Sequence, residues 1–278
     1  MSQTAASPSL PTIAFIGGGN MASAIIGGLI HQGQPASQIE VVEPWAEARE
    51  ALRKNYGIEA QAEAGPALQR AGIVVWAVKP QTFKDAAAQA KAHTQAALHL
   101  SVAAGIRSDS IAQWLASERV VRTMPNTPAL VGKGMSALYA RPAVTEAERQ
   151  SVEAIMASTG EFLWVESEKQ LDAVTALSGS GPAYVFYFLE AMTRAGVGMG
   201  LSEQQAHQLA VGTFVGASEL ARRSDEPPAV LRQRVTSKGG TTYAALQSME
   251  AAGVAASFEA AMRAAEHRAQ ELGDEFGA

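Results

Sequence analysis

Residues 12–30 read TIAFIGGGNMASAIIGGLI, and this stretch decides the fold of the first half of the chain. An apolar strand pattern at 12–16 runs into three consecutive glycines, and a helical pattern follows from residue 20 to residue 32. Residues 17–22 fit the pattern G-x-G-x-x-A, whose glycines let the backbone turn tightly and approach a pyrophosphate. The N-terminus of the next helix offers free N–H groups and partial positive charge to the same anion. This strand–turn–helix context favours a dinucleotide-binding loop over a purely structural turn.

An acidic residue ends the second predicted strand, which covers residues 39–42. Glu43 lies 24 residues after Gly19, near the spacing at which an acid accepts hydrogen bonds from an adenosine ribose. A carboxylate at this place favours NADH, because it repels the 2′-phosphate of NADPH. Arg49 and Arg53 follow one or two helical turns later and would suit NADPH instead. A solvated strand end is the alternative for Glu43, so the residues leave the choice of cofactor open.

Strand patterns and helix patterns alternate through the first half. The predicted strands lie at residues 12–16, 39–42, 73–78, 98–102 and 120–123, with last candidates at 136–139 and 161–165. The helical patterns lie at residues 20–32, 44–56, 80–92, 111–116 and 146–158, and Gly57 is the stop signal of the second. Apolar strands that alternate with helices are typical of a parallel sheet covered on both faces. We therefore predict a doubly wound, Rossmann-like α/β domain over residues 12–166, preceded by a disordered tail at 1–11.

The second half shows helical patterns alone. They lie at residues 171–195, 202–222, 228–234, 241–251 and 255–272. Several are apolar on nearly every face, most clearly AYVFYFLEAM at 183–192. A helical region of this size cannot easily bury so much apolar surface alone, so we expect it to pair with a second copy. The sequence therefore predicts an all-α dimerisation domain over residues 167–278.

Composition excludes several classes of protein. Hydrophobic residues make up 47% of the 278 residues and charged residues 18%, which supports a sizeable core. The net charge of −5, without a basic block, argues against a nucleic acid partner. The absence of cysteine excludes thiol nucleophiles and cysteine-bound metals, and the five histidines have no metal-ligand spacing. No apolar run reaches the ~18 residues that cross a bilayer, so we predict a cytoplasmic protein without a membrane partner.

Five further segments follow predicted strands or precede helices. They are AVKPQ at 77–81, SVAAGI at 101–106, RTMPNTP at 122–128, SGSGP at 178–182 and TSKGGTT at 236–242. In a doubly wound sheet the carboxyl ends of the strands line the ligand crevice, so the first three are candidates to contact a cofactor. The last places paired glycines and hydroxyls at a helix N-terminus, which suits a carboxylate. Each segment also has a structural interpretation as a turn, a helix break or a cap, and the residues alone do not separate the two.

Six segments, in chain order and in both halves, together resemble the pyrroline-5-carboxylate reductase family. They are FIGGGNMASAIIGGL (15–29), AVKP (77–80), SVAAGI (101–106), RTMPNTPALVGKG (122–134), DAVTALSGSGPAYVF (172–186) and LRQRVTSKGGTT (231–242). The resemblance implies a Rossmann-like domain, a helical dimerisation domain, and larger oligomers, up to a decamer, assembled from dimers. It also implies reduction of L-1-pyrroline-5-carboxylate to L-proline, the last step of proline biosynthesis, with NADPH or NADH.

The resemblance implies a set of site residues as well. The expected cofactor contacts are Ile16, Gly17, Gly18, Gly19, Asn20 and Met21 at the pyrophosphate, Ala77, Val78, Lys79, Pro80, Val102, Ala103 and Ala104 around the nicotinamide and its ribose, and further Glu43, Pro44 and Asn126. The expected substrate contacts are Glu168, Val235, Ser237, Gly239, Gly240, Thr241 and Thr242. Thr242 matches the hydroxyl that the family places on the substrate, and we assign it the catalytic role. No metal is expected.

Two positions depart from the family's pattern. Lys238 stands where the family usually has the proline of Ser-Pro-Gly-Gly, which loosens the loop and adds a cation near a carboxylate site. Ala64 stands where the family often has an asparagine that contacts the cofactor ribose, so the resemblance leaves the preference for NADPH or NADH open.

The reaction itself asks little of the protein's acids and bases. A cyclic imine carbon accepts hydride and the imine nitrogen is basic, so the site has to hold the ring against the nicotinamide and bind the carboxylate. A β-hydroxyacid dehydrogenase is an alternative, but its chemistry needs a lysine on a helix of the second domain. After residue 166 the only lysines are Lys169 and Lys238, both near helix ends or loops. A non-catalytic nucleotide sensor is the second alternative.

Overall fold

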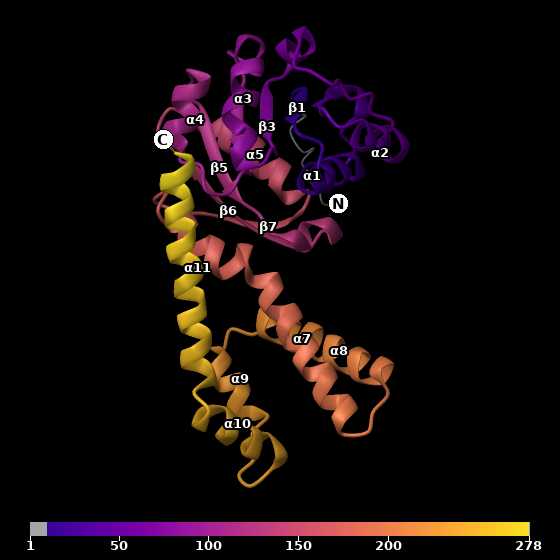
Figure 1. Cartoon of the computed structure of the whole chain (residues 1–278), viewed down its shortest axis with the longest axis vertical. Helices are drawn as coiled ribbons and strands as arrows, with labels where there is room; N and C mark the ends of the chain where they lie inside the picture. Colours follow the sequence, from indigo (N-terminus) through magenta and orange to yellow (C-terminus); the bar gives the residue numbers. More distant parts are fainter. Residues whose placement is uncertain (1–9, 278) are drawn as a thin grey trace, which may run out of the picture. The chain divides into compact units, whose positions relative to one another are not determined.

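The computed structural model describes residues 10–277, which form two compact units (Figure 1). The sheet unit contains the described residues up to Ser180 together with those from Ala265 onward, and the helical unit is Gly181–Ala264. Most of the predicted tail, residues 1–9, lies outside the described residues. The other two tail residues contact the folded chain, because Leu10 packs on the core and Pro11 lies against Gly72.

Seven strands form one sheet in the order β2-β1-β3-β4-β5-β6-β7. Their bounds are β1 Ile13–Ile16, β2 Ile39–Val42, β3 Ile73–Trp76, β4 Leu98–Ser101, β5 Val120–Met124, β6 Gly134–Ala140 and β7 Gly160–Trp164. The first five strands run parallel. From β1 the chain passes to β2 on one side and then to β3 on the other. A topological switch point, where such sheets bind ligands, therefore lies at the carboxyl ends of β1 and β3.

Strand β6 departs from the predicted parallel sheet, because it runs antiparallel to β5. The connection between the two strands contains only the short 3-10 helix η4, Thr127–Val131. A parallel crossover needs a dozen or more residues, so a connection this short can only reverse the chain. The next connection holds the whole helix α5, Glu146–Ala157, and β7 accordingly runs parallel to β6.

Alternate residues of the central strands enter two separate cores, as a doubly wound sheet requires. Ile13 and Phe15 of β1 pack with α1 (Asn20–His31), α2 (Ala46–Tyr56) and α5. Ala14 and Ile16 pack instead with α3 (Pro80–Ala90) and α4 (Ser108–Leu115). Burial on both faces explains why these strands are continuously apolar instead of alternating.

Local signals set most of the helix ends, and a distant side chain sets one of them. Gly57 ends α2 in the left-handed conformation, with φ of 68°, as predicted. Thr145 and Glu148 form a capping box at the start of α5. Helix α4 begins three residues before the predicted start at 111, because the Ser108 N–H donates to the carboxylate of Glu168 at 2.6 Å.

The helical pattern at 171–195 is interrupted next to the SGSGP segment at 178–182, for which a helix break was one of the two interpretations. It consists of α6 (Gln170–Val174), the π-helical segment η5 (Thr175–Gly179) and α7 (Gly181–Gly198). Because α6 and η5 pack in the sheet unit, this unit extends to Ser180. The domain boundary after residue 166 remains a prediction.

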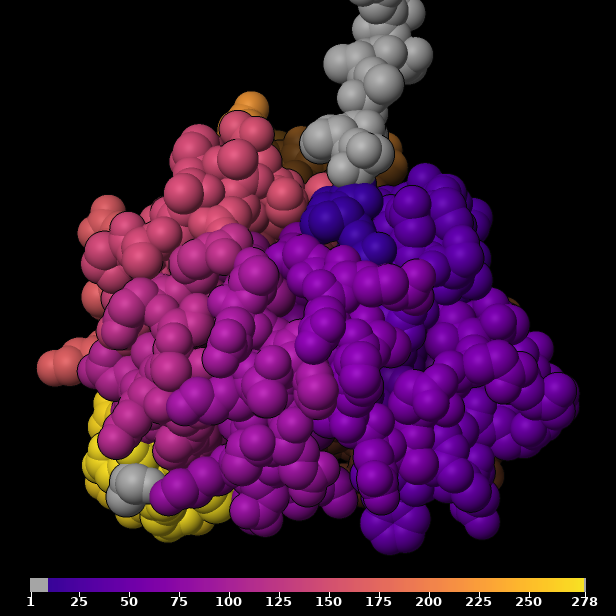
Figure 2. Space-filling view, turned by 90° about the horizontal axis from the view of Figure 1, so that it is seen from above, coloured from indigo at the N-terminus to yellow at the C-terminus, as the bar shows by residue number. Residues whose placement is uncertain are grey.

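The end of α11 (Val254–Phe276) also belongs to the sheet unit. Its Leu272 lies against Gly105, and the Ser110 hydroxyl donates to the carbonyl of Gly277 at 2.6 Å. Figure 2 shows this end of α11, in yellow, at one edge of the sheet unit.

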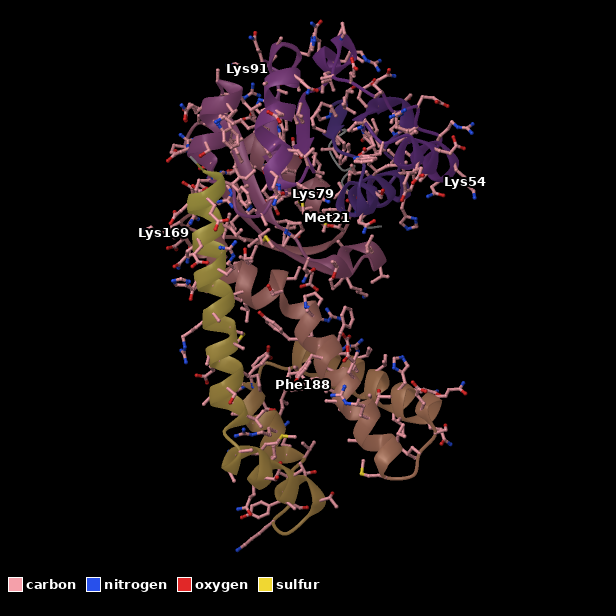
Figure 3. The ribbon with its side chains drawn as sticks, viewed as in Figure 1. Met21, Lys54, Lys79, Lys91, Lys169 and Phe188 are labelled. Carbon is pink, nitrogen blue, oxygen red and sulfur yellow. The ribbon has the colours of Figure 1, made fainter. Side chains whose placement is uncertain are left out.

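The helical unit contains α7, α8 (Glu203–Arg223), α9 (Pro228–Arg234), α10 (Thr241–Ala251) and the first part of α11, as the periodicity predicts. Phe188, labelled in Figure 3, packs on Phe258 with ring centroids 5.7 Å apart. Large apolar side chains remain exposed, including Phe186 at 59% and Leu220 at 70%. They supply the apolar surface from which the sequence predicts self-association. Among the described residues, no helix combines the length and the apolar character of a membrane span.

A buried histidine makes the stability of the sheet unit depend on pH. His99 is fully buried on β4, and its Nδ1 accepts the indole N–H of Trp76 at 3.2 Å. Burial, with a smaller contribution from the charge of Arg119, lowers the pKa of His99 from 6.5 to about 4. Between these pH values the unfolded chain binds a proton that the folded chain does not.

We therefore expect the free energy of unfolding to be highest above pH 6.5 and to fall by about 3 kcal/mol as the pH drops toward 4, from this one group. Urea titrations at several pH values would measure it, with His99→Gln as the control that lacks the titrating ring. A variant whose unfolding free energy keeps the full pH slope of the unmodified chain would contradict the assignment to His99.

Candidate dinucleotide and substrate site

The predicted glycine loop lies at the switch point and is held against the end of β3. Gly17 has φ of 98°, and its N–H donates to the carbonyl of Val42 at 2.8 Å. A Cβ added to Gly17 would come within 2.5 Å of the Ala77 carbonyl oxygen. The loop therefore approaches the strand more closely than any residue with a side chain permits. This contact brings the predicted segments 16–21 and 77–80 together.

The outer part of the same loop is open. Gly19 is exposed and precedes α1 without a side-chain cap, and a Cβ added to it would meet no atom within 4 Å. Within the described part of the chain, no side chain caps the first N–H groups of α1, which begins at Asn20. Met21, the second residue of the helix, is labelled in Figure 3. An open glycine backbone at a helix N-terminus fits a pyrophosphate, so the residues present suit a dinucleotide.

Glu43 is buried at the end of β2, with 5% exposure, so it is not a solvated strand end. One carboxylate oxygen accepts the N–H of Gly18 at 2.7 Å, and the other accepts the N–H of Trp45 at 2.9 Å. The carboxylate thereby ties the glycine loop to the β2–α2 turn. Its contact with a ribose remains a prediction, as does that of the exposed Pro44.

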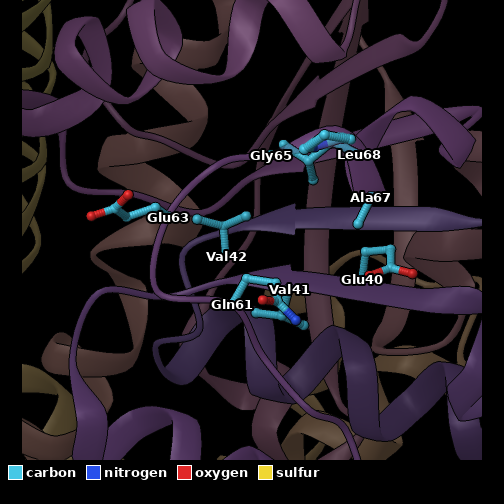
Figure 4. Close-up of a pocket in the computed structure, with 9 residues that line it drawn as sticks. Glu40, Val41, Val42, Gln61, Glu63, Gly65, Ala67 and Leu68 are labelled. Carbon is cyan, nitrogen blue, oxygen red and sulfur yellow. The ribbon is translucent and has the colours of Figure 1, made fainter.

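Beside the carboxyl end of β2, residues of the following segment form a small pocket (Figure 4). Gln61 pairs with this end of the strand, since the N–H of Glu43 donates to its carbonyl at 2.8 Å. Glu63 and Gly65 are also among the residues that line the pocket. Ala64, between them, packs against the core cluster that contains Ala14 and Ile16.

The ends of β3 and β4 carry the segments predicted to line the nicotinamide. The N–H of Ala77 donates to the carbonyl of Ile16 at 2.8 Å, and the N–H of Val102 to that of Trp76 at 3.0 Å. Lys79 is exposed directly before α3, which begins at Pro80. Thus the structure brings 77–80 and 102–104 to the same edge of the sheet as the glycine loop.

Both ends of the Asn126 side-chain amide form hydrogen bonds within the protein. Its Nδ2 donates to the hydroxyl of Ser178 at 3.2 Å, and its Oδ1 accepts the N–H of Met135 at 2.9 Å. The side chain therefore fastens the loop after β5 to the π-helical segment η5 and to β6. A cofactor contact by Asn126 remains a prediction.

Glu168 takes part in a buried ion-pair network. It accepts from the N–H and the hydroxyl of Ser108 at 2.6 and 2.7 Å, and from Nη1 of Arg122 at 2.6 Å. Burial lowers the pKa of the Arg122 guanidinium, and the charge and hydrogen bond of Glu168 oppose that shift. A second pair, Arg107 with Asp172 at 2.9 Å, lies between the β4–α4 loop and α6.

Sequence reasoning gave no site role to Ser108, Arg107 or Asp172, and it named Arg122 only as part of the candidate segment 122–128. The one available signal was Arg122, a charged residue inside the apolar strand VVRTM, because a buried charge requires a partner. The network now links the end of the predicted nicotinamide loop to β5 and α6.

The other predicted substrate residues form a local turn before α10. Gly239 has φ of 74°, and the N–H of Gly240 donates to the carbonyl of Ser237 at 3.0 Å. Thr241 and Thr242 are exposed in the first turn of α10, which no side chain of residues 10–277 caps. Free N–H groups and hydroxyls at a helix start suit a carboxylate. Lys238 in place of proline leaves this turn formed.

Val235 ends α9 with 68% exposure, two residues before that turn. Glu168 belongs to the sheet unit, and the other substrate residues belong to the helical unit. Within residues 10–277, no group of three or more acidic or histidine side chains gathers in a way that would hold a metal.

Comparison with known proteins identifies the class and then the family. Residues 12–105 match the family model described as NADP oxidoreductase coenzyme F420-dependent, and residues 168–272 match that described as pyrroline-5-carboxylate reductase dimerisation. With the open glycine loop at the switch point, the first match defines a nicotinamide-dependent oxidoreductase. The second match supports self-association through the helical region.

Similarity extends over almost the whole chain. A pyrroline-5-carboxylate reductase of Pseudomonas aeruginosa is 45% identical over 271 residues, covering 97% of this chain and 99% of the relative. The reductase of Haemophilus influenzae is 41% identical, covering 94% and 97%. The chain therefore belongs to the pyrroline-5-carboxylate reductase family.

Solved structures agree. The reductase of Coxiella burnetii superposes with a TM-score of 0.88 at 36% identity, covering 95% of this chain and 98% of the other. That of Plasmodium falciparum, solved with NADP bound, has a TM-score of 0.86 at 28% identity, covering 95% and 99%. These matches confirm the predicted Rossmann-like sheet with a helical dimerisation region, and NAD(P)H as the cofactor.

Proposed function

We propose that this chain reduces the imine of L-1-pyrroline-5-carboxylate to give L-proline, by hydride transfer from NADPH or NADH, as the last step of proline biosynthesis. The observation that carries the proposal is similarity to a reductase of the family over 97% of this chain, together with the open glycine loop. The enzyme acts on a CH–NH group: the imine carbon gains the hydride, and the ring nitrogen gains a proton.

The bound nicotinamide supplies the hydride, and the chain supplies position. The strand-end backbone at 102–104 supports a flat ring, because its side chains are small. The free N–H groups at the start of α10 would hold the substrate carboxylate, and the Thr242 hydroxyl would donate to that carboxylate or to the ring nitrogen. Holding the ring against the hydride donor is the main catalytic contribution.

The helical region is proposed to pair two copies into a dimer, with larger assemblies up to a decamer built from dimers. The exposed apolar side chains of α7 and α8, such as Phe186 and Leu220, support this proposal. The reaction is proposed to take place in the cytoplasm, without nucleic acid or membrane partners; the absence of cysteine fits a reducing compartment.

The test of this function is the oxidation of NADPH or NADH by the purified chain with L-1-pyrroline-5-carboxylate. We expect loss of NAD(P)H absorbance matched by formation of L-proline. Absence of oxidation by a folded sample that binds the cofactor would overturn the proposal and favour a nucleotide sensor. Neither Lys169, which precedes α6, nor Lys238, in a loop, lies within a helix as a β-hydroxyacid dehydrogenase would need.

Removing the Thr242 hydroxyl should slow this reaction. For Thr242→Ala we expect kcat/KM for the imine to fall about ten- to one-hundred-fold, as for a lost hydrogen bond to a charged group. Thr242→Ser keeps the hydroxyl and should retain most of the activity. Unchanged kcat and KM in Thr242→Ala would remove Thr242 from the mechanism.

A further inference from the structure

Arg49, near the start of α2, forms no ion pair with a carboxylate within the described residues. Nη1 of Arg49 donates to the carbonyls of Glu43 and Pro44, at 2.9 and 2.6 Å. Arg53, one helical turn further along, is instead paired with Glu50 at 2.6 Å. Two neutral backbone carbonyls therefore hold the guanidinium of Arg49 in place. Because they carry no net charge, its positive charge is not neutralised and can attract an anionic ligand.

The donor fork of Arg49 is only partly used. Within residues 10–277, its Nε and Nη2 make no hydrogen bond, and the side chain is partly exposed. A planar guanidinium has five N–H donors, arranged to match two oxygens of a phosphate. The unused edge of Arg49 is thus a prepared site for a phosphomonoester.

The carboxylate of Glu43 is engaged at the turn between β2 and α2. Its two oxygens accept the N–H groups of Gly18 and Trp45, and the residue is 5% exposed. The hydrogen bonds of the Glu43 carboxylate thus hold the glycine loop against the start of α2. An acceptor for ribose hydroxyls has to be accessible, and the Glu43 carboxylate is not, whereas the Arg49 side chain is partly exposed beside it.

We propose that Arg49 determines cofactor specificity by binding the 2′-phosphate of the adenosine ribose, so that this chain prefers NADPH to NADH. In dinucleotide-binding sheets the ribose lies at the carboxyl end of the second strand, and an arginine nearby accommodates the 2′-phosphate. Arg49 is held at that strand end by the carbonyl of Glu43 itself. The inference rests on the cofactor site of the proposed function and is independent of the imine substrate.

The experiment measures binding of two adenosine fragments, 2′,5′-ADP and 5′-AMP, to the full chain by calorimetry. We expect the unmodified chain to bind 2′,5′-ADP more tightly than 5′-AMP. In Arg49→Ala the affinity for 2′,5′-ADP should fall about ten- to one-hundred-fold while that for 5′-AMP stays within twofold, because only the first fragment has the 2′-phosphate. Arg49→Lys keeps the charge without the fork and should fall in between.

Arg53→Ala is the matched control, since Arg53 lies on the same helix but is already paired with Glu50. It should change neither affinity. Trp45 is 76% exposed at the same turn, so its fluorescence gives a second readout of binding.

Two results would overturn the proposal. One is equal binding of the two fragments by the unmodified chain, and the other is an Arg49→Ala chain that keeps its 2′,5′-ADP affinity or loses both affinities equally. If Arg49→Ala does not fold, Arg49→Lys with intact 5′-AMP binding decides the point. No imine is present, so a chain that selects 2′,5′-ADP yet fails to make proline would refute the proposed function alone.

Discussion

Gly17→Ala is expected to abolish measurable dinucleotide binding and to lower the free energy of unfolding by about 2–5 kcal/mol. Gly17 has φ of 98°, a conformation that alanine rarely adopts, and the new Cβ would lie 2.5 Å from the carbonyl oxygen of Ala77. That oxygen is part of the backbone at the end of β3, so it cannot turn away as a side chain would. Relief of the clash must move the glycine loop away from β3 and misplace the pyrophosphate site.

Calorimetry with NADPH and urea unfolding would measure the two effects. Gly19→Ala is the matched control, because Gly19 has φ of −70° and an added Cβ meets no atom within 4 Å. Its stability should stay within about 1 kcal/mol of the unmodified chain, so any loss of affinity there reports on the ligand itself. A Gly17→Ala chain that binds NADPH like the unmodified chain would show that the loop does not hold the pyrophosphate.

Local sequence signals predicted those elements whose ends they mark. The bounds of α9 and α10 match the predictions at 228–234 and 241–251, because a proline begins one and paired glycines precede the other. The strands of the sheet core were predictable because both of their faces are buried, which makes them continuously apolar. The glycine loop was predictable because its glycines, the strand before them and the helix after them are adjacent in the chain.

Features that depend on contacts between residues far apart in the chain could not be predicted from the sequence. The start of α4 depends on Glu168, 60 residues later, whose carboxylate receives the Ser108 N–H. The sequence offered a helix break at 178–182, but it did not predict the π-helical form of the break or the hydrogen bond that joins it to Asn126, 52 residues earlier. Glu43 stood at the predicted place, but its hydrogen bond to Gly18 depends on a side-chain orientation that spacing does not specify. Partner identity, and not residue type, limits what the sequence alone predicts.

Glu168→Ala is expected to destabilise the sheet unit by about 3–5 kcal/mol, because it leaves the charge of Arg122 buried without its partner. The Arg122 side chain is 6% exposed, and Nη1 loses the acceptor that now lies at 2.6 Å. The same change removes the acceptor of the first N–H of α4, at the end of the predicted nicotinamide loop. Affinity for NADPH should therefore fall together with the free energy of unfolding.

Glu50→Ala is the matched control, since the side chains of the Glu50–Arg53 pair are 60% and 54% exposed, so that solvent screens their attraction and its loss should leave the free energy of unfolding nearly unchanged. The double variant Arg122→Met with Glu168→Leu removes both charges and should regain much of the stability that Glu168→Ala alone loses, because a buried ion pair replaced by apolar groups is often nearly neutral. Urea unfolding of the four chains decides between the explanations. If Glu168→Ala lowers the free energy of unfolding no more than Glu50→Ala does, the Arg122 charge finds water or another acceptor. If the double variant is as unstable as Glu168→Ala, the loss of stability comes from the uncapped start of α4 and not from the unpaired charge of Arg122.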